Sequence, residues 1–322
     1  MSRLIVVFLD GVGIGEPDPA VNPFFAANLP NLHSLFGSLP DLGEPVRRPT
    51  DSGRPRVPGY TPDIPAVAFP LDANLGTEGT PQSGTGQTTL LTGQNGAELF
   101  GRHFGPWVPT ALRDVVRNQS ILKRALDAEL RVAFANAYPT GWPGERGGRR
   151  VAGPPLAAQG AGLLTRNEVE LAEHRAVASE MTNGGWKKFL GFEDLPDVTA
   201  AQAGATLATI GHEHDLTLYA HYSTDTAGHR GGMAGTVSAL EKVDEFMGGL
   251  VGECFSPDRG TPEDAPSILI CSDHGNIEDV RTGHTRNPAL GALIGTWAHD
   301  FDPASLSALE QIPAWVMRHL SQ

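Results

Sequence analysis

Short apolar runs rich in β-branched residues recur along the chain and stop abruptly at polar residues. Runs of this length and composition predict buried β-strands. The strands that we predict in this way cover residues 4–9, 66–71, 131–135, 216–220, 268–271 and 288–294. The first run is apolar throughout rather than alternating, which is typical of a central strand of a parallel sheet with both faces buried.

Segments with helical spacing of apolar residues lie between these runs. The spacing predicts helices over residues 31–36, 110–126, 167–181, 199–212, 237–251 and 305–320. The second of these patterns breaks near Asn118, Thr199 is the predicted N-cap of its helix, and Pro313 interrupts the last one. Helices that alternate with strands predict an α/β fold.

Two stretches are rich in glycine and proline and interrupt this alternation. Residues 38–65 show neither helical nor strand periodicity and predict an extended surface loop. Residues 138–197 change in character in the same way, and we predict that they form an inserted lid or small cap. The predicted core then comprises residues 1–137 and 198–322.

Carboxylates and imidazoles follow the ends of predicted strands. Asp10 comes directly after the first run, and Asp273-His274 follow the run that ends at Cys271, with His284 later in the same loop. In open α/β sheets the carboxyl ends of the strands are where ligands bind. Any one of these residues alone would be an ordinary turn aspartate or surface histidine. Together they predict a metal site.

A third strand end adds two more candidate ligands. Asp225 and His229 follow the run at 216–220, and a spacing of four residues puts both side chains on one face of a helix that begins there. The complete set of candidate ligands is Asp10, Asp225, Asp273, His229, His274 and His284. Mixed nitrogen and oxygen ligation of this kind suits two divalent cations, Zn²⁺ or Mn²⁺ rather than Ca²⁺. Two such ions are the arrangement for in-line displacement at phosphorus.

A glycine- and threonine-rich stretch, residues 79–93, contains the candidate nucleophile Ser83. Small residues precede a segment that becomes apolar and predicts a helix, so backbone N–H groups at its start would favour an anion. A hydroxyl at this position can become a nucleophile in contact with a divalent cation. A simple helix-capping turn is the alternative interpretation.

Composition narrows the class of partner. Lys+Arg number 24 and Asp+Glu number 37, which gives a formal net charge of −13, so nucleic acid and anionic membranes are poor candidates for binding. A small anionic substrate would need a local positive centre, which metal ions supply. The two cysteines form no disulfide framework, and the run at 4–9 is too short for a signal peptide or a membrane span. We therefore expect a cytoplasmic protein without a membrane partner, and no repeat or heptad pattern predicts an oligomeric state.

Five motifs in this order resemble those of the alkaline phosphatase superfamily. They are the Asp10 segment, Ser83-Gly84-Thr85-Gly86, Asp225-Thr-Ala-Gly-His229, Asp273-His274-Gly275-Asn276 and Gly283-His284-Thr285-Arg286. The most similar branch is the group of cofactor-independent phosphoglycerate mutases and phosphopentomutases, and the resemblance covers the predicted core. It implies a mixed, largely parallel sheet between helices.

The same resemblance implies roles for individual residues. One metal ion would be held by Asp10, Ser83, Asp273 and His274. The other would be held by Asp225, His229 and His284. Ser83 would take up the phosphoryl group of a small phosphorylated substrate as a covalent intermediate.

Two features depart from the mutases. They carry a histidine four residues after the nucleophile, where this chain has Gln87, which can bind a phosphoryl oxygen but cannot act as an acid or base. The insertion is also shorter than their cap, and its basic cluster Arg146, Arg149 and Arg150 supplies our other candidates for substrate binding, with solvated loop charges as the alternative.

Three functions therefore remain open. A phosphatase would let water hydrolyse the phosphoserine, whereas a phosphomutase would return the phosphoryl group to another hydroxyl. The short, glycine-rich lid favours hydrolysis, because it excludes water less completely. A metal-binding sensor without catalysis is the third possibility, and the presence of both the hydroxyl and the full ligand set argues against it.

Overall fold

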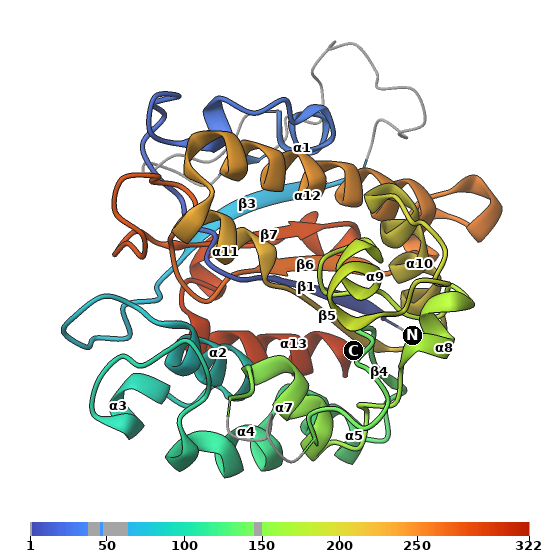
Figure 1. Ribbon diagram of the computed structural model, residues 1–322, viewed down its shortest axis with the longest axis horizontal. Coiled ribbons are helices and arrows are strands. Elements are labelled where there is room, and N and C mark those ends of the chain that lie inside the picture. The colour runs from blue at the N-terminus through green and yellow to red at the C-terminus, as the bar shows by residue number, and fades with distance from the viewer. Residues whose placement is uncertain (1, 38–45, 48–63, 145–149, 322) are drawn as a thin grey trace.

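The computed structural model describes residues 2–37, 46–47, 64–144 and 150–321, and within them seven strands form one sheet (Figure 1). The strands in spatial order are β2 (Val46–Arg47), β3 (Ala66–Leu71), β7 (Ala289–Ile294), β6 (Ser267–Cys271), β1 (Leu4–Leu9), β5 (Leu216–His221) and β4 (Val132–Phe134). The predicted strands are all present, with ends that shift by one or two residues.

The strand β1 lies inside the parallel part of the sheet. It pairs in parallel with β5 on one side and β6 on the other, and β4 extends the parallel part beyond β5. The pairings β6–β7, β7–β3 and β3–β2 are antiparallel. The carboxyl ends of β6, β1 and β5 therefore meet at one edge of the sheet, and the predicted α/β class with a mixed, largely parallel sheet is confirmed.

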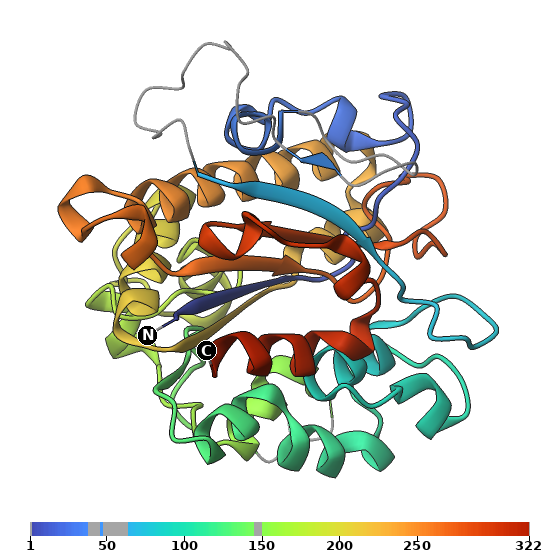
Figure 2. The ribbon, with the colours of Figure 1, turned by 180° about the vertical axis from the view of Figure 1, so that it is seen from behind.

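Helices cover both faces of the sheet, as the two opposite views show (Figure 1, Figure 2). The α-helices in the described residues are α1 (Pro30–Phe36), α2 (Ser83–Thr92), α3 (Gly96–Phe100), α4 (Arg113–Gln119), α5 (Ile121–Asp127), α7 (Gly153–Gly160), α8 (Glu168–Ala172), α9 (Gly184–Leu190), α10 (Ala200–Glu213), α11 (Ser223–Arg230), α12 (Gly232–Cys254) and α13 (Ile312–Leu320). Short 3₁₀ turns lie at Pro23–Phe25, Thr110–Leu112, Pro257–Arg259, Pro262–Asp264, Thr296–Ala298, Pro303–Ser305 and Leu309–Gln311.

Two hydrophobic clusters hold these layers together. Alternate residues of β1 enter different clusters, because successive strand side chains point to opposite faces. Leu4 and Phe8 join the cluster formed with α2, α4, α5, α7 and α13. Ile5 and Val7 join the cluster formed with α1, α10 and α12. The apolar continuity of β1 thus reflects burial on both faces.

Most predicted helices are present, with local explanations for their ends. The Thr199 side chain accepts a hydrogen bond from Gln202 N and caps α10. The break near Asn118 separates α4 from α5, where the side chain of Ser120 accepts from Lys123 N.

Two helix predictions were wrong in extent. Only Glu168–Ala172 of the predicted helix 167–181 is helical, because Val177 turns back and exchanges backbone hydrogen bonds with Ala135 and Ala137 beside β4. The closing helix begins at Ile312 rather than near residue 305, and Pro313 lies in its first turn, where a missing N–H costs nothing.

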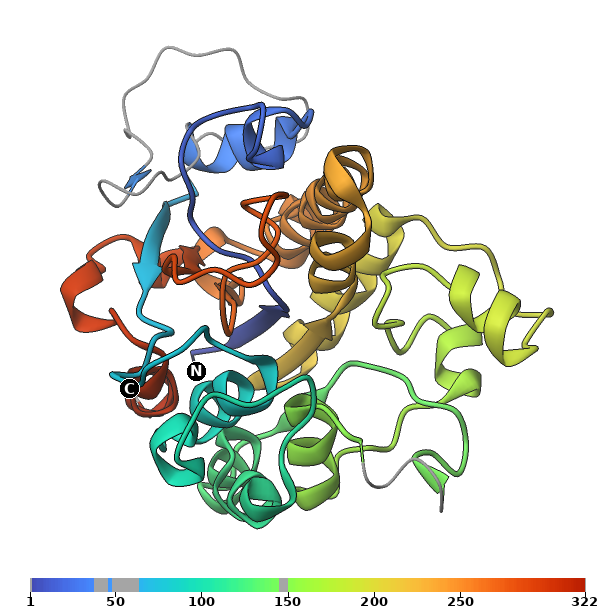
Figure 3. The same ribbon diagram turned by 60° about the vertical axis from the view of Figure 1, so that its left-hand side comes forward.

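The predicted insertion contacts the molecule in two ways. Its helix α7 buries Leu156 and Ala157 in the main cluster beside α4 and α2. Its helices α8 and α9 belong to a small separate cluster that includes Trp186 and Leu195 (yellow-green in Figure 3). The division into core and cap stays a prediction, and most of the predicted loop 38–65 lies outside the described residues.

Among the described helices, none combines the length and the apolar character that crossing a membrane requires.

Candidate metal centre

The three predicted aspartates meet at the carboxyl ends of adjacent strands. Asp10 follows β1, Asp273 follows β6, and Asp225 lies in the first turn of α11 just after β5. Asp10 and Asp273 are buried, and Asp225 is partly buried. The topology therefore brings together residues that are far apart in the sequence.

One group of candidate ligands consists of Asp10, Asp273 and His274, whose ligand atoms lie within 4.8 Å of one another. The His274 Nε2 atom lies 3.4 Å from Asp10 Oδ1, 3.7 Å from Asp273 Oδ2 and 3.0 Å from Ser83 Oγ. The other ring nitrogen, Nδ1, lies 3.2 Å from the backbone oxygen of Gly275. A proton on Nδ1 that is donated to this carbonyl leaves the Nε2 lone pair facing the carboxylates and the serine.

A second group surrounds Asp225. Its carboxylate oxygens lie 3.3 Å from His284 Nε2 and 3.5 Å from His229 Nε2, and the two Nε2 atoms are 2.9 Å apart. The i, i+4 spacing of Asp225 and His229 on α11 puts both on one helix face, as predicted. His284 Nδ1 lies 2.9 Å from the backbone oxygen of Pro81, which again directs Nε2 inward.

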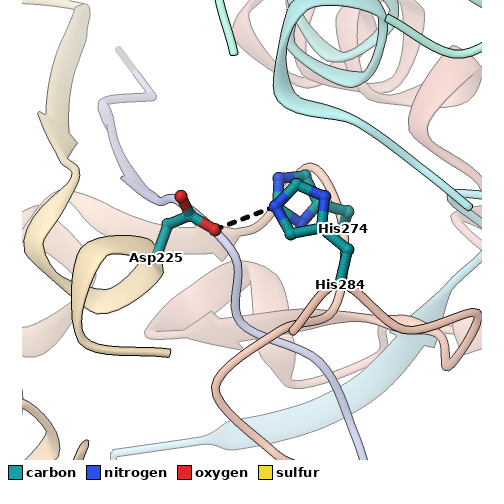
Figure 4. Close-up of side chains that lie close together, drawn as sticks. All are labelled: Asp225, His274 and His284. Carbon is teal, nitrogen blue, oxygen red and sulfur yellow. Dashed lines mark ion pairs between the residues drawn. The ribbon is translucent and has the colours of Figure 1, made fainter. Parts of the chain in front are cut away.

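The two groups are contiguous. Asp225, His274 and His284 form a set whose ligand atoms also lie within 4.8 Å of one another, so His274 belongs to both groups. Figure 4 shows the Asp225 carboxylate facing the two imidazoles, whose ring centroids are 4.0 Å apart. The division of ligands between two metal ions stays a prediction.

The pKa values reflect crowded charges. Burial, and then the charge of Asp273, raise the pKa of Asp10 well above its usual range. Burial also raises the pKa of Asp273. Burial alone would lower the pKa of His274, but the charges of Asp273 and Asp10 outweigh it and raise this pKa to about 10. Burial would raise the pKa of Asp225, but its contact with His284 and the charge of His274 bring it down to about 2.

The residues present fit divalent cations. Asp10 Oδ1 is buried and makes no hydrogen bond, with His274 Nε2 beside it at 3.4 Å, and a buried carboxylate oxygen without a bonded donor is costly unless a cation faces it. Carboxylate oxygens, imidazole nitrogens and a serine oxygen form a donor set typical of Zn²⁺ or Mn²⁺. Carboxylates that raise each other's pKa bind cations because a positive charge relieves their repulsion.

The candidate nucleophile begins α2. Ser83 is 2% exposed, and the N-cap residue Gln82 makes no side-chain hydrogen bond to the helix start. Gly84 lies against the backbone of Trp107, and a Cβ atom there would come within 2.2 Å of Trp107 O. A glycine at this position therefore lets the loop lie directly against the helix that presents Ser83.

The side-chain amide of Gln87 faces the carboxylates of Asp10 and Asp273. Its Nε2 atom donates to Asp10 Oδ2 at 3.2 Å and to Asp273 Oδ2 at 3.1 Å, and its Oε1 accepts from Gly153 N at 2.8 Å. The predicted substrate-binding role of Gln87 stays a prediction, since none of these contacts supports it.

The basic cluster is only partly described. Arg146 and Arg149 lie outside the described residues. Arg150 is exposed, and its guanidinium carbon lies 4.8 Å from the ring centroid of Trp107. Its predicted contact with substrate stays a prediction.

A cavity of about 730 Å³ opens beside the second group. It is lined by Asp225, His229 and His284 together with Gln82 and Arg230, among other residues. The sequence analysis missed Arg230, although its position directly after His229 was a usable signal. Asn276 was part of a quoted motif without a predicted role, and Glu278 was not predicted, because their contacts arise only in the folded chain.

Comparisons with known proteins show similarity to metalloenzymes. A family model described as Metalloenzyme superfamily matches residues 194–320, which include Asp225, His229, Asp273, His274 and His284. The 2,3-bisphosphoglycerate-independent phosphoglycerate mutase of Gloeothece citriformis is 37% identical over 88 residues, which cover 25% of this chain and 15% of that protein. The corresponding mutase of Ruthia magnifica is 29% identical over 173 residues, which cover 46% of this chain and 32% of that protein.

The chain thus spans about a third or less of the length of these relatives. Among solved structures, the lipoteichoic acid synthase LtaP from Listeria monocytogenes aligns with a TM-score of 0.50 at 9% identity, over 99% of this chain and 72% of its own. At that identity the likeness concerns the fold alone.

Proposed function

We propose that this chain, a metalloenzyme of the alkaline phosphatase superfamily, hydrolyses a small phosphate monoester through a phosphoserine intermediate on Ser83. The observation that carries this proposal is the distance of 3.0 Å between Ser83 Oγ and His274 Nε2 inside a ring of three carboxylates and three imidazoles. The candidate ligands beside the Ser83 hydroxyl support a chemical role for it.

The candidate ligands would hold two divalent ions, Mn²⁺ or Zn²⁺. One ion would be held by Asp10, Ser83, Asp273 and His274, and the other by Asp225, His229 and His284. Bound there, the cations would supply positive charge that favours an ionised serine oxygen and offsets the charge of the phosphoryl oxygens.

The chain itself supplies the nucleophile and its orientation. Ser83 Oγ, which has lost its proton, attacks phosphorus, the bond between phosphorus and the ester oxygen breaks, the departing alkoxide takes up a proton to leave as the alcohol, and the phosphoryl group remains on the serine. The start of α2, with its backbone N–H groups, favours the negative charge of that group. Attack by water on the phosphoserine then releases phosphate and restores the hydroxyl.

Hydrolysis is favoured over transfer to a second hydroxyl because water reaches the site. The His229 side chain is 44% exposed, and the cavity beside it is lined by exposed Arg230 and Thr226. A phosphomutase is the second candidate, because the two relatives are phosphoglycerate mutases.

The test is Ser83→Ala with Ser120→Ala as its matched control. Both serines are buried at helix N-termini, but Ser120 caps α5 away from the candidate ligands. We expect the Ser83 variant to lose at least about a thousandfold in kcat while it keeps its metal content, whereas the Ser120 variant loses stability, about 1 kcal/mol, and keeps its activity.

The assay should follow Mn²⁺- and Zn²⁺-loaded protein with p-nitrophenyl phosphate, phosphorylated sugars and phosphoglycerates. Free phosphate and isomerised product are both recorded. Release of phosphate that needs Ser83 supports the phosphatase, and isomer without phosphate supports the mutase. Undiminished turnover by the Ser83 variant would refute both, and metal binding without any turnover in the wild type would favour a sensor.

A further inference from the structure

The carboxylate of Glu278 lies at the centre of a hydrogen-bond network beside the candidate metal centre. It is 1% exposed. Its Oε2 atom accepts from Gly13 N at 3.0 Å and from Asn276 N at 2.8 Å. Its Oε1 atom accepts from the Thr285 hydroxyl and from Asn287 Nδ2 at 3.2 Å.

All four contacts are donors, which suits an ionised carboxylate because it only accepts. Within the described residues, no lysine, arginine or histidine nitrogen lies within 4.0 Å of Glu278. The buried carboxylate is therefore stabilised by neutral donors alone, and each donor counts because buried charge without partners is costly.

The donors come from segments that also carry candidate ligands. Gly13 lies three residues after Asp10, and Thr285 directly follows His284. Asn276 lies two residues after His274. One carboxylate thus joins the segment after Asp10 to the His274 and His284 segments of the loop between β6 and β7.

The loops are held closely against this carboxylate. A Cβ atom on Gly13 would come within 2.4 Å of Glu278, and one on Gly275 would come within 2.3 Å. The backbone of Gly275 also pairs with Thr285, whose N–H donates to the Gly275 oxygen at 2.9 Å. The segment that bears His284 is therefore fixed to the segment that bears His274.

The hydrogen-bond network of Glu278 extends to Asp225 through Asn276. Asn276, whose N–H donates to Glu278, donates from its own side chain to Asp225 Oδ1 at 2.6 Å. A change at Glu278 would therefore reach the ligands of the second group, Asp225 and His284, on two routes.

We propose that Glu278 is a positioning residue that sets the separation of the two metal subsites by holding the His284 segment against the loops of Asp10 and His274. The inference rests on the proposed two-metal function, and it assigns to Glu278 no contact with metal or substrate. Loss of the Glu278 contacts should weaken binding at the Asp225–His284 subsite more than at the Asp10–Asp273 subsite, because Gly11 N and Gln87 also hold Asp273.

Two variants each remove different hydrogen bonds of Glu278. Glu278→Gln can keep its oxygen toward the Gly13 and Asn276 N–H groups, but it presents an NH₂ group to Thr285 and Asn287. Thr285→Val removes the hydroxyl that donates to Glu278 and accepts from Asn287 N at 3.2 Å, and it keeps the shape of the side chain.

The matched control is Asp244→Asn. Asp244 is another buried carboxylate that accepts from two backbone N–H groups, Leu32 N at 2.8 Å and Asn31 N at 3.2 Å, but it fixes α1 to α12 rather than the candidate ligands. It measures what the loss of a buried carboxylate does to stability alone.

The measurement is an equilibrium titration of each metal-free protein with Mn²⁺, in which electron paramagnetic resonance counts the free ion. We expect two sites in the wild type and in Asp244→Asn. In Glu278→Gln and Thr285→Val one of the two sites should lose about 10- to 100-fold in affinity while the other changes less. Hydrogen exchange of the metal-free proteins should be faster over residues 279–287 in the two network variants and unchanged there in the control.

Each outcome has one meaning. Two unchanged sites in both network variants, with unchanged exchange in the loop, would overturn the role of Glu278 while leaving the proposed function intact. Equal weakening of both sites in Asp244→Asn and in the network variants would reduce the effect to lost stability and overturn it as well. A wild type that binds no Mn²⁺ or Zn²⁺ would instead overturn the proposed function.

Discussion

Replacing Gln87 by Glu tests whether the site holds its carboxylates apart with neutral donors when no metal is bound. The two side chains have the same shape, and the glutamate can still accept from Gly153 N. On the other side, the NH₂ group that donates to Asp10 and Asp273 becomes an oxygen that faces two carboxylate oxygens at about the distances of 3.2 and 3.1 Å. The metal-free variant therefore needs a proton on this cluster.

The magnitude follows from the two lost bonds. A hydrogen bond to a charged group contributes about 1.5–3 kcal/mol, so the ionised glutamate loses about 3 kcal/mol or more. One pKa unit corresponds to about 1.4 kcal/mol, so its pKa should rise from about 4.3 in the unfolded chain to about 6.5 or above in the folded one. Because the folded state then binds more protons than the unfolded state, stability falls as pH rises through this window. The penalty relative to wild type should be about 1 kcal/mol at pH 5 and about 3 kcal/mol at pH 7.

Urea unfolding of the metal-free proteins in the presence of a chelator measures this difference. Gln202→Glu is the control, because Gln202 is exposed and its side chain accepts from Thr199 N in a capping box that a glutamate also satisfies. Its stability should follow that of the wild type across the same pH range. Parallel stability curves for wild type and Gln87→Glu would refute the reasoning, because they would mean that the amide donors contribute nothing to the metal-free site.

Two further predictions concern the cavity and a buried histidine. Arg230 lines the cavity, so Arg230→Ala should raise KM for an anionic phosphate ester about tenfold with a smaller change in kcat. The control Arg281→Ala removes a partner of Asp279 and should leave KM and kcat unchanged. Steady-state kinetics on the metal-loaded proteins would contradict this prediction if the two variants behaved alike. Burial lowers the pKa of His221 from 6.5 to about 4. Between pH 6.5 and pH 4 the unfolded state therefore binds more protons than the folded state. The free energy of unfolding should fall by about 3 kcal/mol in total as the pH drops through this range. His221→Asn should remove this part of the pH dependence in urea unfolding, and an unchanged slope would exclude the histidine as its source.

The strands, and the position of the candidate ligands at one edge of the sheet, could be predicted because both depend on local pattern. Apolar runs such as that of β1 indicate buried strands, and the polar residue after each run then lies at the sheet edge by geometry alone. The i, i+4 pair of Asp225 and His229 needed only the period of a helix. These inferences use neighbours in sequence and the shape of one element.

The rest depends on contacts between distant segments. Nothing local distinguishes Glu278 from a solvated loop residue, because its donors include Gly13, which lies on a different strand end. The helix predicted over 167–181 had the right spacing, but pairing of Val177 with Ala135 and Ala137 replaced most of its helical bonds. In each case tertiary packing outweighed local preference.

The order of strands in the sheet has a consequence for biosynthesis. Leu4 of β1 pairs with Leu216 of β5 and with Ser267 of β6, so the earliest strand of the sheet has no lasting partners until most of the chain has been made. Until then its six apolar residues are open to association with other chains, and closing so long a loop is slow. The candidate ligands Asp10, Asp225 and Asp273 come together only when this closure is complete. A cation that binds the candidate ligands would therefore stabilise the folded chain and not the nascent one.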